Sequence, residues 1–534
     1  MLVAPASRAG RVNRTGKIGQ AVEQTHRIGE AVASDSNVAG LAASASANWP
    51  DVTALVDSSS EFALTWQQID NAVNAAAATL RASGVAPGDR VVVRLPTSIG
   101  YAVAVLGVLR AGGIAVPSSP LAPDAELRGL LAHSGAATVI AATDHVEWPG
   151  EAGTVLPAPD LSGAPAEPVV PVTGGEDIAM LCYTTAAKGA PRGVMLSHRA
   201  LLANVEQIGQ LRPAPVAHGD RILVAIPLFH VYGFGLGLLQ VAARGATAVL
   251  AERFDATKAL DECVRHQITI VAGVPTMYRE FAELPAGELA AGLASVRLLT
   301  SGAAPLHPKV LAAIEEATGL GVYEGYGLTE TAPVLTSTIV TGYPKPGSVG
   351  RAIPGVELRL IGNDGAELGA PVPLDDDDPD DLLEEDDVTG VVSVRGQNLF
   401  SGYWPDGDGG PDADGWFPTS DVGYLDLDGD LHLVDRLNDL IIVNGFNVYP
   451  HEVEDVIAEL PGVAEVAVIG VVDDRSGEAV KAVVVVAPSA ALSEQQVIEH
   501  CTTQLARYKV PSFVEFADEL PRTATGKLTR TPLR

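Results

Sequence analysis

The sequence predicts an α/β protein in which a large N-terminal domain of layered sheets and helices is followed by a small α+β domain. Helix-like and strand-like segments alternate from residue 64 onward. Hydrophobic residues make up 47% of the chain and aromatic residues only 5%, which favours layered helices and sheets over an aromatic-rich β sandwich. At 534 residues, the chain is long enough for about two to four domains.

Four segments near the start of this alternation establish the pattern. Residues 64–85 place apolar side chains at helical spacing and end at Gly84, and residues 89–96 have the composition of a buried strand. Residues 101–113 are again helical, and residues 114–117 form a short apolar strand. Strands separated by helices favour parallel pairing, so we expect a largely parallel sheet with helices on its faces.

The chain divides into three parts. The first thirty residues are basic but have no apolar core of signal-peptide length, so we expect residues 1–35 to be a mobile extension and expect no secretion. Residues 36–436 form the large domain. Residues 437–534 form the small domain, where the pattern changes to strand, helix, strand, strand, helix.

Charge and cysteine content restrict the partners and the location. The formal net charge of -31 disfavours binding to nucleic acid or to anionic membranes. The longest apolar stretches are interrupted by Arg110 and Arg244, so we expect no membrane span. The three cysteines, Cys182, Cys263 and Cys501, stand alone without metal-type spacing, which indicates a reduced, cytoplasmic protein.

Residues 182–194, CYTTAAKGAPRGV, are typical of a loop that binds an anion. Gly189 and Gly193 allow backbone N–H groups to point inward, and Lys188 and Arg192 add positive charge. The segment is not the phosphate loop of P-loop NTPases. Taken alone, it is equally consistent with a turn that binds nothing.

Further motifs follow this loop in an order that resembles the adenylate-forming superfamily, which includes acyl-CoA synthetases, luciferases and the adenylation domains of peptide synthetases. The resemblance covers residues 45–534 and is strongest to the fatty-acid–CoA ligase branch. The matching segments are YTTAAKGAPRGV (183–194), PLFHVYGFG (227–235), VPT (274–276), SGAAPL (301–306), GYGLTET (325–331), GWFPTSDVGYLDLDGDLHLVDR (415–436), NGFNVYPHEVE (444–454) and PRTATGKLTR (521–530).

The resemblance implies an ATP-dependent acid–thiol ligase with Mg²⁺ and CoA. Such an enzyme first forms an acyl adenylate and pyrophosphate, and then the CoA thiol displaces AMP. The small domain is expected to be mobile and to change its orientation between the two steps, with a hinge at Asn438. Residues 229–239 contain no acidic side chain, although relatives that activate amino acids use an aspartate to bind the substrate ammonium. We therefore expect a fatty or related apolar carboxylic acid as the substrate.

The resemblance also assigns roles to individual residues. Glu330 suits Mg²⁺, which prefers carboxylate and phosphate oxygens, and Thr184 is the second expected metal ligand. Asp421 can accept hydrogen bonds from both ribose hydroxyls, and Lys527 can neutralise charge near the α-phosphate. The expected catalytic residues are Lys527, Glu330 and His230. The expected ATP-binding residues are Thr184, Thr185, Lys188, Gly189, Arg192, Gly302, Ala303, Ala304, Tyr326, Gly327, Thr329, Asp421 and Arg436. The expected acyl pocket comprises His230, Val231, Phe234, Val274 and Met277, and the expected CoA-binding residues are Gly445 and Phe446.

The phosphate loop departs from the pattern of the superfamily. Where relatives have a glycine followed by two threonines, this chain has Ala186, Ala187 and Lys188, and Arg192 replaces the usual lysine. Each lost hydroxyl contact would weaken phosphate binding by about 1.5 to 3 kcal/mol. The altered loop therefore leaves open a non-catalytic homologue that binds nucleotide or acyl chain. Fatty-acyl-AMP ligases, which load an acyl carrier protein, also resemble this chain and stay open as a second alternative to the CoA ligase.

Overall fold

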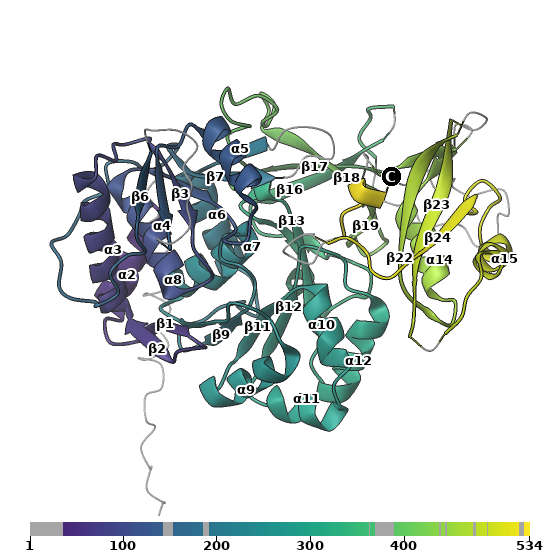
Figure 1. The fold of residues 1–534 in the computed structure, drawn as a ribbon, viewed down its shortest axis with the longest axis horizontal. Coiled ribbons are helices and arrows are strands. Elements are labelled where there is room, and N and C mark those ends of the chain that lie inside the picture. The colour runs from purple at the N-terminus through teal and green to yellow at the C-terminus, as the bar shows by residue number, and fades with distance from the viewer. Residues whose placement is uncertain are drawn as a thin grey trace, which may run out of the picture.

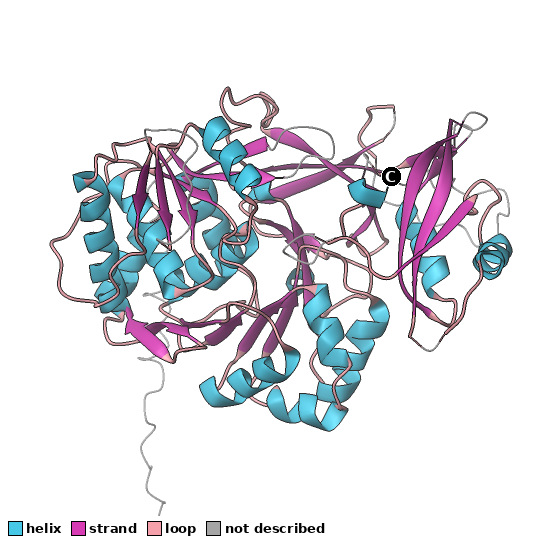
Figure 2. Cartoon of the chain, viewed as in Figure 1, coloured by secondary structure: helices cyan, strands magenta, loops and turns pink. Residues whose placement is uncertain are grey.

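The computed structural model describes residues 36–142, 153–184, 192–362, 364–368, 389–436, 439–443, 446–473, 477–488, 490–522 and 528–533. Its strands form four sheets. Three belong to the large domain, and the fourth belongs to the C-terminal domain, which lies at the right of Figure 1 in yellow-green. Helices pack against the two larger sheets of the large domain (Figure 2).

A six-stranded sheet forms the first layer of the large domain, in the order β6-β5-β3-β4-β7-β8. Its neighbouring strands are parallel except for β7 and β8, which form an antiparallel pair. The strands are β3 (Arg90–Arg94), β4 (Ile114–Pro117), β5 (Thr138–Ala141), β6 (Thr154–Leu156), β7 (Ile178–Thr184) and β8 (Arg192–Ser197). The helices of this region are α2 (Gly40–Asn48), α3 (Trp66–Ala82), α4 (Ile99–Ala111), α5 (Asp124–Ser134) and α6 (His198–Gly209).

Two of these helices, α3 and α4, pack closely because small residues meet between them. A Cβ atom added to Gly107 of α4 would lie only 2.7 Å from the Cβ atom of Ala76 on α3. All residues of α4 are buried, and its single cation, Arg110, pairs with Asp70 of α3 at 2.7 Å. A buried cation is stable only when it is paired in this way. The sequence therefore specifies α4 as a central helix.

A nine-stranded sheet forms the second layer, in the order β15-β14-β13-β12-β11-β9-β10-β1-β2. The central strands β1, β10, β9, β11, β12 and β13 run parallel to one another. The outer pairs β1–β2, β13–β14 and β14–β15 are antiparallel. The strands are β1 (Thr53–Asp57), β2 (Phe62–Thr65), β9 (Arg221–Val224), β10 (Thr247–Leu250), β11 (Ile270–Gly273), β12 (Leu298–Ser301), β13 (Val322–Gly327), β14 (Val334–Ser337) and β15 (Arg351–Ala352). Its helices include α7 (Val231–Phe234), the π-helix η1 (Gly235–Gln240), α8 (Val241–Arg244), α9 (Ala256–His266), α10 (Pro275–Ala282), α11 (Ala286–Gly292) and α12 (Pro308–Thr318).

The remaining strands form a four-stranded antiparallel sheet and the sheet of the small domain. The first contains β16 (Val356–Ile361), β17 (Gly390–Gly396), β18 (Trp416–Leu425) and β19 (Leu431–Arg436). The second has the order β21-β20-β23-β22, with β24 beside β23. Its elements are β20 (Ile441–Val443), β21 (Phe446–Val448), α14 (Pro450–Ala458), β22 (Val463–Asp473), β23 (Gly477–Val486), α15 (Glu494–Gln504) and β24 (Phe513–Ala517).

The predicted elements agree closely with the observed ones. The helix predicted over residues 64–85 is α3, which begins at a capping box formed by Thr65 and Gln68 and ends before Gly84. The helix after the phosphate loop begins where Ser197 accepts a hydrogen bond from the N–H of Ala200 at 3.1 Å. Within the described residues, every helix is too short or too polar to cross a membrane.

The sheet topology brings several strand ends together. The parallel strands β12 and β13 end at Ser301 and Gly327, and β7 of the other sheet ends at Thr184. In α/β proteins, ligands commonly bind beyond the carboxyl ends of the parallel strands. The loops after these three strands are therefore the place to look for a site.

Candidate active site

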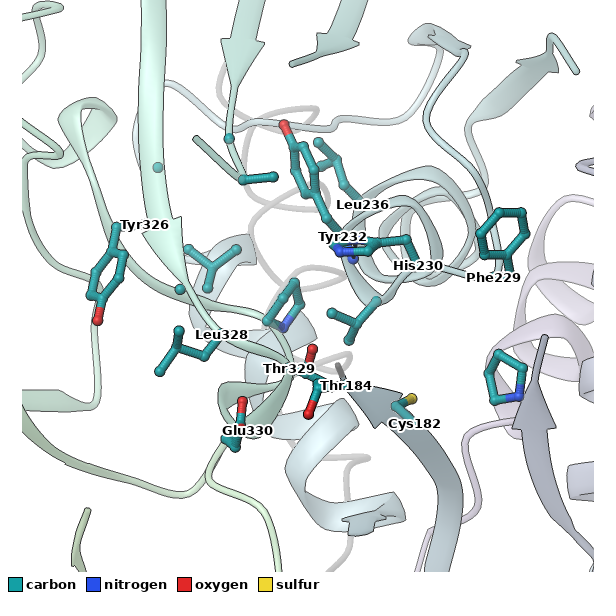
Figure 3. A pocket seen from close by; sticks show the side chains of 18 of the residues that line it. Cys182, Thr184, Phe229, His230, Tyr232, Leu236, Tyr326, Leu328, Thr329 and Glu330 are labelled. Atoms are coloured by element: carbon teal, nitrogen blue, oxygen red, sulfur yellow. Dashed lines mark hydrogen bonds between the residues drawn. The ribbon is translucent and has the colours of Figure 1, made fainter. Parts of the chain in front are cut away.

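A cavity of about 920 Å³ lies where these strand ends meet. Its walls come from both layers of the large domain and from β18, and Figure 3 shows ten of its lining side chains by name. The predicted residues that line it are Thr184, Arg192, His230, Val231, Gly302, Ala303, Tyr326, Gly327, Thr329, Glu330 and Asp421. The fold therefore collects residues from five separate sequence motifs in one cavity.

Other predicted residues cannot be placed at the cavity. Ala304 is described but is not among the lining residues. Backbone positions are described for Arg436 and Phe446, but not their side chains. The residues outside the described part are Thr185, Lys188, Gly189, Asn438, Gly445 and Lys527.

One end of the cavity contains the expected nucleotide residues. Tyr326 of β13 donates a hydrogen bond from its hydroxyl to Oδ2 of Asp421 at 2.7 Å. Asp421 is 5% exposed and is the register partner of Arg436 on the neighbouring strand β19. Beside them, Ala303 has a φ of +71°, a strained conformation for a residue with a Cβ atom. An aromatic face, a carboxylate and an exposed backbone loop can recognise adenine and ribose together.

Sequence reasoning missed Glu324, a buried carboxyl group in the same wall. It is 5% exposed, and its Oε2 accepts a hydrogen bond from the N–H of Leu306 at 3.0 Å. Burial raises the pKa of Glu324 to about 7, although the N–H of Leu306 acts in the opposite direction. Leu306 ends the segment SGAAPL, so Glu324 ties the loop after β12 to β13. Because side chains alternate along a strand, a strand prediction over residues 322–327 would have placed residues 324 and 326 on one face, in agreement with the alternating burial of β13.

The expected metal ligands lie in the central part of the cavity. Glu330 belongs to a short 3₁₀ helix, Thr329–Thr331, and its Oε1 accepts a hydrogen bond from the hydroxyl of Tyr403 at 2.8 Å. Figure 3 shows Thr184, Thr329 and Glu330 near one another at the end of β7. A carboxylate with neighbouring hydroxyl groups matches the oxygen ligands that Mg²⁺ prefers, so these residues fit the ion.

The charge of Glu330 also affects the thiol group of Cys182. Burial raises the pKa of Cys182 to about 12, and the negative charge of Glu330 contributes to the rise. The Cys182 thiol lines the cavity but stays protonated, so it is a poor nucleophile. The free cysteines at positions 182, 263 and 501 are all buried.

A third part of the cavity is largely apolar. His230 precedes α7, and its Nδ1 accepts a hydrogen bond from the N–H of Tyr232 at 3.2 Å. The Tyr232 hydroxyl lies 3.4 Å from the Thr300 hydroxyl. Figure 3 shows the side chains of His230, Tyr232 and Leu236 in the same region of the cavity. The apolar lining of the cavity includes Ile208, Leu211, Pro215, Leu236 and Ile339.

This lining differs from the predicted acyl pocket. Val231 lies at the cavity, but Phe234, Val274 and Met277 belong to the main hydrophobic core and are not among the residues that line the cavity. Phe234 is one helical turn past His230, and its side chain is completely buried. The apolar lining instead includes Ile208 near the end of α6 and Leu236 of the π-helix η1. Neither residue lies in one of the quoted motifs, so sequence reasoning did not single them out.

Comparison with known proteins identifies the family. The pattern of AMP-binding enzymes matches residues 42–404, and that of the AMP-binding enzyme C-terminal domain matches residues 452–527. Feruloyl-CoA synthase of Amycolatopsis sp is 38% identical over 483 residues, which cover 88% of this chain and 94% of that protein. A long-chain-fatty-acid–CoA ligase of Mycobacterium tuberculosis is 34% identical over 509 residues, which cover 91% and 95%.

Solved structures give the same result. ATP-bound MatB from Rhodopseudomonas palustris superposes with a TM-score of 0.82 at 30% identity, over 93% of this chain and 98% of MatB. The apo structure of MatB, with the same identity and coverage, gives a TM-score of 0.71.

The chain therefore belongs to the family of AMP-binding enzymes. This membership confirms the predicted acyl-CoA synthetase branch of the adenylate-forming superfamily and the α/β fold with a large and a small domain. It also confirms an AMP-forming acid–CoA ligase that uses ATP, Mg²⁺ and CoA.

Proposed function

We propose that this enzyme activates an apolar carboxylic acid, fatty or related, as its acyl adenylate and transfers the acyl group to CoA. The observation that carries the proposal is one continuous cavity that joins three chemically different parts. Tyr326 and Asp421 supply the nucleotide end, Glu330 supplies the metal ligand, and an apolar arm extends past Tyr232.

In the first half-reaction, a carboxylate oxygen of the acid attacks the α-phosphorus of ATP, and the bond to pyrophosphate breaks. Asp421 and Tyr326 hold the nucleoside, so the α-phosphate lies near the acid bound in the apolar arm. Mg²⁺ held by Glu330 and Thr184 would neutralise the leaving pyrophosphate. Arg192 and Lys527 provide positive charge as negative charge develops on the phosphate oxygens.

In the second half-reaction, the thiol sulfur of CoA attacks the acyl carbonyl carbon, and the bond to the AMP oxygen breaks. We propose that rotation about Asn438 brings Gly445 and Phe446 to the cavity and removes Lys527. The greater likeness to ATP-bound MatB than to apo MatB supports assigning the present orientation to the ATP-bound stage.

The apolar arm supports a substrate without an α-amine. Its side chains are Ile208, Leu211, Pro215, Leu236 and Ile339, and no acidic residue lies between positions 229 and 239. A second candidate is an aromatic acid, because Tyr232 adds a ring and a hydroxyl to the cavity wall and a similar protein is a feruloyl-CoA synthase.

The test is pyrophosphate release with a panel of acids, measured with and without CoA. Fatty acids of several lengths, ferulate and acetate distinguish the two substrate classes. Turnover that requires CoA supports the ligase, whereas turnover that requires an acyl carrier protein supports the alternative acceptor. If no acid on the panel releases pyrophosphate, the altered phosphate loop has left a non-catalytic homologue. The cytoplasmic location stays a proposal.

A further inference from the structure

Tyr403 is a cavity residue that the sequence motifs did not indicate. It lies in a short segment that pairs with β8, directly after the phosphate loop. The N–H of Ser401 donates to the carbonyl of Met195 at 2.9 Å, and the N–H of Trp404 donates to the carbonyl of Gly193 at 2.8 Å. Tyr403 also forms an antiparallel bridge with Val194. These bonds fix the backbone of Tyr403 against the strand that carries Arg192.

The side chain of Tyr403 lies between a carboxylate and a cation. Its hydroxyl donates to Oε1 of Glu330 at 2.8 Å, and the guanidinium carbon of Arg192 lies 5.2 Å from its ring centroid. The ring packs edge-on against Phe400, with the centroids 5.0 Å apart. Phe400 in turn donates its backbone N–H to the carbonyl of Glu330 at 2.9 Å. The backbone hydrogen bonds to β8 and the ring contact with Phe400 therefore fix the position of Tyr403.

The two charged neighbours of Tyr403 have different expected partners in Mg²⁺·ATP, the metal ion and the phosphates. Glu330 needs a free oxygen for the metal, whereas Arg192 needs its N–H groups for phosphate. A carboxylate and a guanidinium that contact the same side chain could instead pair directly with each other. Within the described part of the chain, no ion pair joins Arg192 to Glu330, and the Tyr403 hydroxyl occupies one oxygen of Glu330 instead.

We propose that Tyr403 is a positioning residue that orients the Glu330 carboxylate toward the metal and keeps Arg192 from pairing with it. The proposal rests on the proposed function, because it takes Glu330 as the Mg²⁺ ligand. Hydrogen bonds to a metal-binding carboxylate fix its orientation, and their loss typically weakens metal affinity by about 10- to 100-fold.

The test is equilibrium binding of Mn²⁺·ATP to the Tyr403→Phe variant in the absence of acid and CoA. Binding is monitored by electron paramagnetic resonance of the Mn²⁺ ion. Phenylalanine keeps the ring under Arg192 and removes only the hydroxyl. We expect Mn²⁺·ATP affinity to fall at least about tenfold, with unchanged affinity for metal-free ATP and an unchanged melting temperature. Tyr343→Phe is the matched control, because Tyr343 is exposed and is not among the residues that line the cavity, and it should bind like the wild type.

Two outcomes would overturn the proposal. Wild-type Mn²⁺·ATP affinity in Tyr403→Phe would show that the hydroxyl does not position the ligand, and an equal loss with and without metal would indicate a general defect. A variant at the metal ligand itself, Glu330→Gln, separates this result from the proposed function. If Mn²⁺ binding falls in both variants but the wild type forms no acyl adenylate, the positioning role holds and the catalytic proposal fails.

Discussion

Arg279 of α10 and Glu465 of β22 form an ion pair between the large and small domains, with Nη1 and Oε1 2.7 Å apart. Glu465 also pairs with Arg522 of its own domain at 2.7 Å. Burial alone would raise the pKa of Glu465, but the hydrogen bonds from the two arginines lower it. On the same helix, the hydroxyl of Tyr278 donates to the carbonyl of Thr300 in the cavity wall at 2.8 Å. Helix α10 therefore contacts both the cavity wall and the small domain.

We predict that Arg279→Ala weakens the present domain orientation, because a rotating small domain must break this pair and can keep the one to Arg522. Partly exposed ion pairs contribute at most about 1 kcal/mol, so acyl-adenylate formation should slow about threefold. Thioester formation from prepared acyl adenylate and CoA should not slow. The control is Arg265→Ala, which breaks an ion pair with Glu61 inside the large domain. An equal change in both half-reactions would contradict the role in domain orientation.

Glu324 should make the stability of the unliganded protein depend on pH. The folded protein binds the carboxyl proton of Glu324 more tightly than the unfolded chain does, because burial raises the pKa of Glu324 from 4.5 to about 7. The stabilisation is complete below about pH 4.5 and is lost as the pH rises through 7. The shift corresponds to about 3 kcal/mol of unfolding free energy. Urea denaturation at pH 5 and pH 8 should show this loss in the wild type and not in Glu324→Gln.

A matched variant, Glu316→Gln, removes an exposed carboxyl group on α12 and should keep the pH dependence of the wild type. The account of Glu324 would be refuted by the same pH dependence in Glu324→Gln as in the wild type.

Leu236→Trp should shorten the apolar arm of the cavity. The backbone of η1 cannot move away, because a Cβ atom on Gly235 would lie 3.0 Å from Pro333 and one on Gly237 only 2.7 Å from Val224. The introduced indole ring must therefore fill the apolar arm of the cavity. We expect the KM for the longest accepted acids to rise at least about tenfold, a loss of about 1.4 kcal/mol, while the KM for ATP stays the same. Leu236→Met should preserve the acid profile, and an equal loss for short and long acids would place the acyl group elsewhere.

Lys527→Ala should separate the two half-reactions. A strong donor near the α-phosphate acts only in adenylate formation, so we expect that step to slow at least about a hundredfold. The same variant should convert prepared acyl adenylate and CoA to thioester at nearly the wild-type rate. Gly445→Trp should have the reverse effect, because it obstructs the expected CoA segment. Parallel loss of both steps in Lys527→Ala, with the fold intact, would contradict alternation of the small domain.

Local patterns in the sequence were sufficient to predict much of the fold. Residues 114–117 form β4 as predicted, and the predicted helix over residues 101–113 is α4 with slightly different ends. Ser197 caps α6 because its hydroxyl reaches an N–H group three residues later. Such interactions depend on neighbouring residues alone, so a single sequence reveals them.

The candidate site was only partly predictable, because several of its contacts join distant segments. Tyr403 reaches Glu330 across 73 residues, and Arg279 reaches Glu465 across 186. Phe234 and Leu236 illustrate a second difficulty, since two residues so close along one helical segment face the core and the cavity respectively. Apolar composition alone cannot tell these faces apart.

The central claim is that this chain joins an acid to CoA through an acyl adenylate, and a single-turnover experiment with ATP labelled at the α-phosphate tests it most directly. With a fatty acid or ferulate but no CoA, labelled acyl adenylate should accumulate on the enzyme. Addition of CoA should convert it to AMP and acyl-CoA, without ADP. Labelled ADP, or thioester formation without a preceding acyl adenylate, would contradict the account.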